Sequence, residues 1–76
     1  MSMVNTFAPL GGYVIADQDE AGDPKYYGFV NAQGHWYILA INTDGSYKYY
    51  RSSSVAYATG WAGRAGYTYN YFHAAF

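Results

Sequence analysis

The stretch YYGFVNAQGHWYILAINTDGSYKYYR, residues 26–51, holds nearly half of the aromatic residues of the chain. Its runs YYGFV, HWYILAI and SYKYYR are rich in the aromatic and β-branched residues that strands favour. The breaks NAQG and NTDG share one pattern, Asn followed by two residues and Gly. Because a type I turn favours Asn at its first position and Gly at its fourth, the stretch predicts a three-stranded antiparallel β-meander with four-residue hairpin loops.

The two turns also predict which residues pair across the strands. Four-residue loops pair Val30 with His35 and Ile41 with Ser46. Since side chains alternate across a strand, one face is expected to carry Tyr27, Phe29, Trp36, Ile38, Tyr47, Tyr49 and Arg51. The other face is expected to carry Tyr26, Val30, Tyr37, Leu39, Ile41, Lys48 and Tyr50. Both faces are aromatic, whereas a sheet with one wet face alternates apolar and polar residues, so each face is predicted to be covered.

The remaining segments complete a mainly β fold. Residues 1–12 are expected to form an irregular N-terminal arm, and residues 13–76 one small β-rich domain with three central strands and four or five in all. YVIA, residues 13–16, is predicted as an edge strand, DQDEAGDPK as a surface loop, and SSSVAYATGWAGRAG as a loop with at most one helical turn. The tail YTYNYFHAAF fits a strand or a helical face, and we expect a strand that enters a short terminal turn.

The composition leaves few ways to stabilise so short a chain. A domain of 76 residues usually needs disulfides, a metal or oligomerisation. The chain has no cysteine, and His35 and His73 are its only imidazoles, so neither disulfides nor a structural zinc site is expected. Charged residues make up 12% of the chain, against about 25% in typical globular proteins. Oligomerisation or docking onto a larger partner is therefore the predicted source of stability.

The charge pattern and the hydropathy argue against nucleic acid and membrane as partners. The basic residues are too few and too scattered for the basic patch of a nucleic-acid binder; they are Lys25, Lys48, Arg51 and Arg64. No apolar stretch approaches the roughly 20 residues of a membrane span, and the first residues lack the basic start and apolar run of a signal peptide. We expect synthesis in the cytoplasm without a signal peptide or transmembrane segment.

The side chains that carry chemistry do not form a catalytic pattern. Four of the five carboxylates fall within residues 17–23 and the fifth, Asp44, lies in a turn, whereas a glycosidase needs two carboxylates across a cleft. The acids of DQDEAGD alternate as calcium ligands do, but the stretch lacks the terminal Glu of an EF-hand loop. We expect no enzymatic activity, no cofactor and no bound metal.

The tyrosines are the strongest functional signal. Tyr and Trp supply large, rigid contact area at interfaces, and they also stack on sugars and quaternary ammonium groups. The residues expected to pack the core are Phe29, Trp36, Ile38 and Leu39. The further tyrosines exceed what one small core accepts, because each buried hydroxyl needs a partner. The candidate interface or binding residues are Tyr26, Tyr27, Phe29, Trp36, Tyr37, Tyr47, Tyr49, Tyr50, Arg51, Trp61, Arg64 and Tyr69. In the expected register Arg51 lies opposite Trp36, which suits either cation–π stacking or a solvated arginine at the sheet edge.

The first hairpin resembles the choline- and glucan-binding repeats of Gram-positive surface proteins. Those repeats run Gly-Trp, a short turn, Gly-x-Trp-Tyr-Tyr-Leu and a further Gly turn. The matching positions here are Gly28, Gly34, Trp36, Tyr37, Leu39 and Gly45, with Phe29 in place of the first Trp and a single copy of the repeat. The resemblance implies a platform of Trp and Tyr rings for a sugar or choline.

A second resemblance covers residues 25–76 and is to short uncharacterised tailed-phage proteins. It is carried by YYGFV, by Gly34-x-Trp36-Tyr37-Ile38, by Tyr50-Arg51, and by Trp61-x-x-Arg64 and Tyr69-x-Tyr71-Phe72 with a final Phe76. Proteins of this kind are presumed to be virion components or virion-associated, so the resemblance implies a place in a virion.

Taken together, the sequence favours a non-enzymatic structural or assembly protein. The expected role is that of a small β-rich subunit that packs through aromatic faces into a bacteriophage virion, as a capsid, neck, tail or fibre component. Its partners would be copies of itself or other virion proteins, with the first dozen residues as an arm on a neighbour. The alternative is a carbohydrate- or choline-binding module that uses Trp36, Tyr37 and nearby tyrosines for stacking. A third hypothesis, a small inhibitor or regulator that acts by protein contact, is not separated from the first by the sequence.

Overall fold

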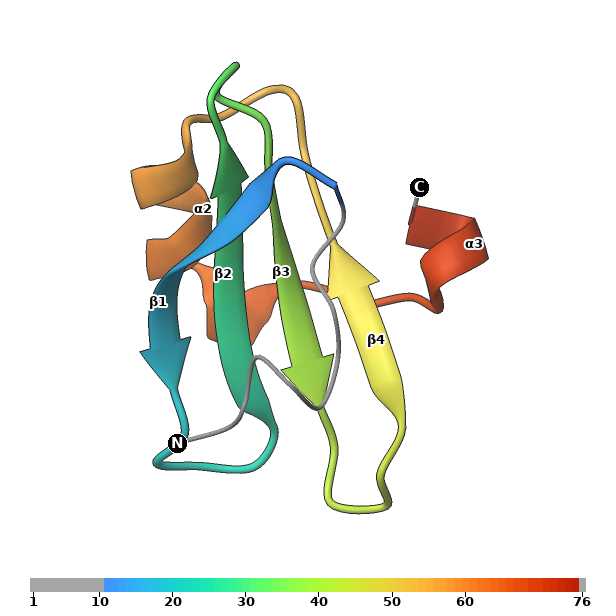
Figure 1. Ribbon diagram of the computed structural model, residues 1–76. Coiled ribbons are helices and arrows are strands. Elements are labelled where there is room, and N and C mark those ends of the chain that lie inside the picture. Colours follow the sequence, from blue (N-terminus) through green and yellow to red (C-terminus); the bar gives the residue numbers. More distant parts are fainter. Residues whose placement is uncertain (1–10, 76) are drawn as a thin grey trace.

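Four antiparallel strands and three short helical segments make up residues 11–75, the part of the chain that the structure, a computed structural model, describes (Figure 1). In chain order the elements are β1 (Tyr13–Asp19), β2 (Lys25–Asn31), β3 (Trp36–Ile41), β4 (Tyr47–Tyr50), α2 (Tyr57–Ala62), η1 (Arg64–Gly66) and α3 (Phe72–Ala75). The sheet order is β1-β2-β3-β4. The predicted mainly β meander is thus confirmed, with four strands. Of the predicted arm, residues 1–10 lie outside the described residues.

Both Asn-x-x-Gly turns form hairpin loops of three residues rather than four. Asn31 ends β2: its N–H donates to the His35 carbonyl at 3.0 Å, and its own carbonyl accepts from the Gly34 N–H at 3.1 Å. The second turn repeats both bonds at Asn42. Gly34 and Gly45 both have φ of 88°, so each glycine is the extra residue of a bulge that follows a type I turn.

The shorter loops shift the register by one residue from the sequence prediction. The observed pairs include Val30–Trp36, Phe29–Tyr37, Tyr27–Leu39, Ile41–Tyr47, Leu39–Tyr49 and Ile38–Tyr50. The predicted pairs Val30–His35, Ile41–Ser46 and Trp36–Arg51 are therefore wrong. A slip of one residue moves every side chain of a strand to the other face. As a result β3 is turned over relative to the prediction, whereas β2 and β4 keep their predicted faces relative to each other.

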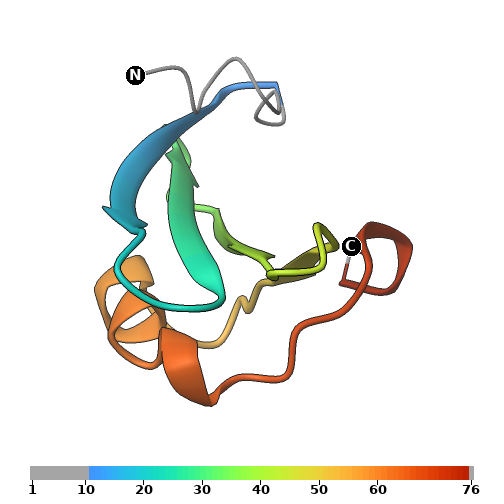
Figure 2. The ribbon, with the colours of Figure 1, turned by 90° about the horizontal axis from the view of Figure 1, so that it is seen from below.

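The hydrophobic core lies on the concave side of a strongly curled sheet. Figure 2 shows the strands following an arc, with α2 and η1 outside it. The buried cluster consists of Tyr27, Phe29, Tyr37 and Leu39, with Tyr13, Ile15, Ile41, Tyr47 and Tyr49 packed against it. Phe29 and Tyr37, which are cross-strand partners, stack with ring centroids 4.7 Å apart. Such pairs add to the stability that burial provides.

The convex side of the sheet is covered by α2. The Trp36 ring packs on Gly60 of this helix, and its Nε1 donates to the Val55 carbonyl at 3.0 Å. Gly28 in β2 leaves room for the Tyr57 ring. Trp36 is 4% exposed and Ile38 is fully buried. Both faces of the sheet centre are therefore buried within one chain, and a neighbouring subunit is not needed to cover either of them.

Three element boundaries differ from the sequence prediction. β1 runs on to Asp19, through residues predicted as surface loop. The segment predicted as loop holds the six residues of α2 followed by η1, which is more than one helical turn. In the tail, Asn70 forms a single bridge to Tyr49, with N–H···O distances of 2.6 and 2.9 Å, and α3 then supplies the terminal turn.

Gly60→Ala should destabilise the fold, because a Cβ at this position would fall on the Trp36 indole. Overpacking costs about 1–3 kcal/mol, and the better helix propensity of Ala offsets at most about 1 kcal/mol. We expect denaturant unfolding to show a net loss of about 1–2 kcal/mol. Gly66→Ala is the matched control, since a Cβ there meets nothing within 4 Å. Equal stability of the two variants would contradict the packing of α2 on Trp36.

Candidate interaction site

The candidate residues from the sequence divide into three groups by exposure. The buried members are Tyr27 (0% exposed), Phe29 (1%), Trp36 (4%) and Tyr37 (2%). The half-buried members are Tyr26, Tyr47, Tyr49, Tyr50, Trp61, Arg64 and Tyr69, and Arg51 is exposed. Trp36 and Tyr37 thus lack the open ring faces that a stacking platform for a sugar or choline needs.

A β-bulge at Ala16 sets the direction of the acidic half of β1. The register advances by two residues in β1, from Ile15 to Asp17, while it advances by one in β2. Without the extra residue Asp17 would share the core face of Ile15. With it, Asp17 and Asp19 project to the convex side, where α2 and η1 lie.

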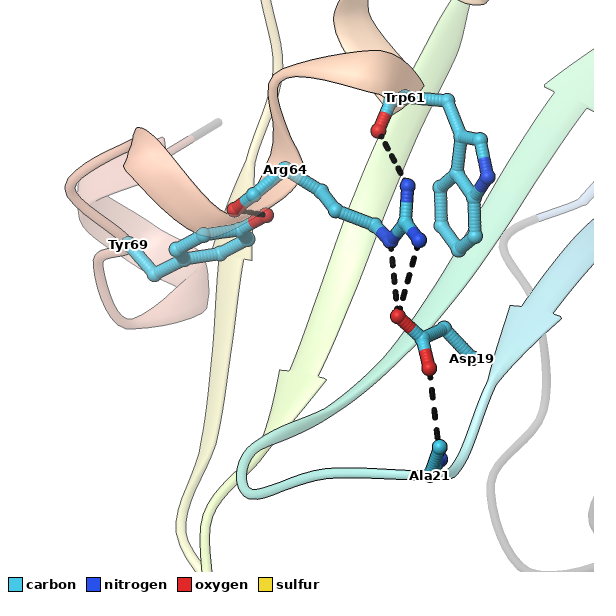
Figure 3. Close-up of polar contacts among 5 residues, drawn as sticks. All are labelled: Asp19, Ala21, Trp61, Arg64 and Tyr69. Atoms are coloured by element: carbon cyan, nitrogen blue, oxygen red, sulfur yellow. Dashed lines mark hydrogen bonds and ion pairs between the residues drawn. The ribbon is translucent and has the colours of Figure 1, made fainter.

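Arg64 ties η1 to the end of β1 (Figure 3). Its Nε and Nη2 both donate to Oδ2 of Asp19, at 3.0 and 2.9 Å, and its Nη1 donates to the Trp61 carbonyl at 3.0 Å. The guanidinium lies over the Trp61 ring, 4.4 Å from its centroid. Charge-assisted bonds and cation–π contact act together here. The cation–π pair of this segment is therefore Arg64 with Trp61.

Tyr57 makes a second tie between α2 and β1. Its hydroxyl donates to the Asp17 carboxylate at 2.8 Å. Both acids that the bulge turns outward therefore meet a donor from the helical segment. A plain solvated loop, which the sequence suggested for these acids, would not hold them in this way.

A row of tyrosine rings continues along the convex side beyond α2. Tyr50 and Tyr67 stack with centroids 4.0 Å apart and planes 9° apart. Tyr26 and Tyr69 lie 5.7 Å apart, and the Tyr69 hydroxyl donates to the Arg64 carbonyl at 2.8 Å. The three members of the Trp61/Arg64/Tyr69 motif are thus brought into one cluster, and its visible role is to fasten the C-terminal segment to the sheet.

The buried phenols reach acceptors at the rim of the core. The Tyr27 hydroxyl donates to Glu20 at 2.6 Å. Burial, and then the bonded carboxylate, raise the pKa of Tyr27 and of Tyr57, and burial likewise raises the pKa of Tyr69. Within the described residues no buried side-chain nitrogen or oxygen lacks a partner. One small core can therefore hold more tyrosines than the sequence argument allowed.

A pocket of about 400 Å³ opens at the end of the sheet where β2 turns into β3. It is lined by Tyr13, Gly34, His35, Trp36, Arg51, Ser52, Ser53 and Val55. The lining combines a guanidinium, an imidazole and two hydroxyls with aromatic and aliphatic walls. None of these residues is acidic, so the pocket suits a negatively charged or hydroxyl-bearing group.

Large apolar side chains remain exposed at the two lateral edges of the sheet. On β1, Val14 is 61% exposed. Beyond β4, Tyr71 and Phe72 are 55% and 43% exposed. Phe72 packs edge-on against Tyr49 at 5.3 Å, and Lys48 lies over the Tyr71 ring at 5.1 Å. Two large apolar side chains are thus exposed side by side beyond β4, and a single one is exposed on β1.

Neither a metal site nor a membrane-spanning helix occurs in the described part of the chain. Among residues 11–75 there is no group of three or more His, Asp or Glu side chains that could hold a metal ion. None of the helices found there combines the length and the apolar character needed to cross a membrane.

No protein-family model, curated protein or solved structure matches this chain.

Several residues of the site were missed by sequence reasoning. Asp17, Asp19 and Tyr57 gain their roles from the bulge, which leaves no mark in the sequence beyond a small residue within the strand. The pocket combines three segments that are separate in the sequence, and its serines belong to a stretch predicted only as a loop. Val14 lies in the predicted edge strand, but the sequence did not show that its side chain stays exposed.

The ion pair of Asp19 with Arg64 should make stability depend on pH in the acid range. The hydrogen bonds from Arg64, and then from Ala21, lower the pKa of Asp19 from 3.8. A carboxyl whose pKa is lower in the folded state contributes stability that is complete above pH 3.8 and disappears as the pH falls through the folded value. Asp19→Asn should therefore melt below the wild type at neutral pH, and the difference should shrink as the pH falls below that value.

The matched control for this experiment is Asp23→Asn. Asp23 lies in the exposed β1–β2 loop without a hydrogen bond or ion pair in the described residues, so its replacement should leave the melting temperature unchanged at both pH values. A constant difference between Asp19→Asn and the wild type from pH 7 to pH 2 would contradict a role for the Asp19 charge.

Proposed function

We propose that the chain is a non-enzymatic structural subunit that joins neighbouring copies into a larger assembly. The observation that carries the proposal is the exposure of large apolar side chains at both lateral edges of the sheet, at Val14 on one side and at Tyr71 and Phe72 on the other. Exposed apolar side chains mark an interaction site when they gather at one place, as Tyr71 and Phe72 do beyond β4. Because Val14 lies on the opposite edge, one copy has room for two neighbours.

Two further features support an assembly role. Charged residues are only 12% of the chain, which suits a protein whose surface meets neighbours rather than water. β1 is an edge strand that pairs only with β2 within the described residues, and a strand edge offers backbone donors and acceptors to another chain.

The assembly we propose is a bacteriophage virion, with the chain as a capsid, neck, tail or fibre component. This part rests on the resemblance of residues 25–76 to short tailed-phage proteins. Mass spectrometry of purified virions from the encoding source should find the chain at high copy number. Its absence from virions, with normal expression in the infected cell, would overturn the virion assignment.

Association should depend on the apolar edges. Val14→Lys places a charge on the β1 edge and should weaken self-association by about tenfold or more, since an unpaired charge buried at an apolar contact is strongly unfavourable. Sedimentation velocity over a range of concentrations measures this. Thr43→Lys, which adds the same charge in the exposed β3–β4 turn, should associate as the wild type does.

The outcome that overturns the assembly role is a wild-type chain that stays monomeric at every concentration and melts cooperatively without concentration dependence. A loss of association that is equal in Val14→Lys and Thr43→Lys would instead show that added charge, not the β1 edge, is responsible.

A further inference from the structure

The pocket at the β2–β3 end of the sheet is electropositive in its composition. Arg51 and the imidazole of His35 line it together with the hydroxyls of Ser52 and Ser53. An arginine beside several hydroxyl donors is a common arrangement for binding a carboxylate. With about 400 Å³, the pocket is as large as pockets that hold a whole small molecule, so it has room for a side chain together with part of the loop that carries it.

The antiparallel fold places the acidic side chains toward the end of the sheet that lies opposite the pocket. The five acidic residues lie in the second half of β1, in the β1–β2 loop and in the β3–β4 turn; they are Asp17, Asp19, Glu20, Asp23 and Asp44. These two connections lie at one end of the sheet, and the β2–β3 turn and the segment after β4 lie at the opposite end (Figure 1). The molecule therefore has an acidic end and an end with an arginine pocket.

Asp23 differs from the other four acids in its contacts. The others each accept a hydrogen bond from a side chain or main chain of the same molecule, from Tyr57, Arg64, Tyr27 and Ser46 respectively. Asp23 has no hydrogen bond or ion pair with another described residue and lies exposed in the loop. The small residues Ala21 and Gly22 precede it, also exposed, so the loop has little bulk near this carboxylate.

The geometry points to the pocket as a carboxylate-binding site that receives Asp23 from the β1–β2 loop of a second copy of this chain. The inference rests on the proposed function, because it names how copies meet. We choose a second copy over a free small molecule because each chain carries both the carboxylate and its complementary pocket, at opposite ends.

A contact between opposite ends is heterologous, so it repeats from copy to copy. Each subunit donates Asp23 to one neighbour and accepts Asp23 from another. Heterologous contacts build closed rings or open filaments. These copies repeat along the strand direction, from one end of the sheet to the other. The first proposal uses the lateral edges instead, so the two kinds of contact use different surfaces.

A charge exchange tests this pairing. Arg51→Glu and Asp23→Arg should each weaken self-association by about tenfold or more, since like charges placed together at an interface are strongly unfavourable. The double variant restores opposite charges with reversed direction and should associate within about threefold of the wild type. Sedimentation velocity measures all four proteins, and their melting temperatures check that these exposed substitutions leave the fold intact.

The matched control is Thr59→Glu, which adds a negative charge on exposed α2 and lies neither in the pocket nor in the β1–β2 loop. It should not weaken association. If both single variants weaken association and the double variant does not recover it, Asp23 and Arg51 are not partners and the inference fails.

Failure of the pocket contact and failure of the assembly role give different results in these experiments. If the charge variants associate as the wild type does while Val14→Lys does not, the pocket contact is overturned and the assembly role stands. If the wild type itself never associates, both are overturned. The pairing of Asp23 with Arg51 is supported only if both single variants lose association and the double variant regains it.

Discussion

The left-handed backbone of Gly34 and Gly45, each with φ of 88°, sets which face of the sheet the aromatic rings of β2, β3 and β4 take. Each glycine closes its hairpin one residue earlier than a four-residue loop would, and a change of one residue turns a whole strand over. The stacking of Phe29 on Tyr37 and the placement of Trp36 under α2 both follow from this closure. In a chain with rings on both faces, composition alone does not select the register, so the turns must do it.

The extra residue at Ala16 acts on β1 as the glycines act on the hairpins. It reverses the alternation within one strand, so that Ile15 packs in the core while Asp17 and Asp19 face the helical segment. The contacts with Tyr57 and Arg64 then join the first strand to α2 and η1, which follow it by some 40 residues. In a chain without cysteine these contacts link distant parts of the sequence without a covalent bond.

The sequence predicted the strands, their order and the two turns, because these depend on local preferences. It did not predict the register, because Asn-x-x-Gly fits hairpin loops of three and of four residues. The two loops differ in whether the backbone of the Asn pairs with the residue after the Gly, as it does here. The same error occurred at both hairpins, so it cancelled between β2 and β4: Tyr27, Phe29 and Tyr49 share a face as predicted. Of the candidate site, the cluster of Trp61, Arg64 and Tyr69 was recognised as a group, but its partner Asp19 depends on a bulge that local preference does not reveal.

The distribution of burial changes where an interaction surface is to be sought. The rings at the sheet centre were the obvious candidates, yet they are buried by the chain's own curl and by α2. A side chain already removed from water gains nothing further from a partner, whereas Val14 and Tyr71 still lose exposed area on contact. The abundance of rings in residues 26–51 is thus explained by the core of a small protein. The large apolar side chains that the described fold leaves exposed lie instead at its margins, on β1 and beyond β4.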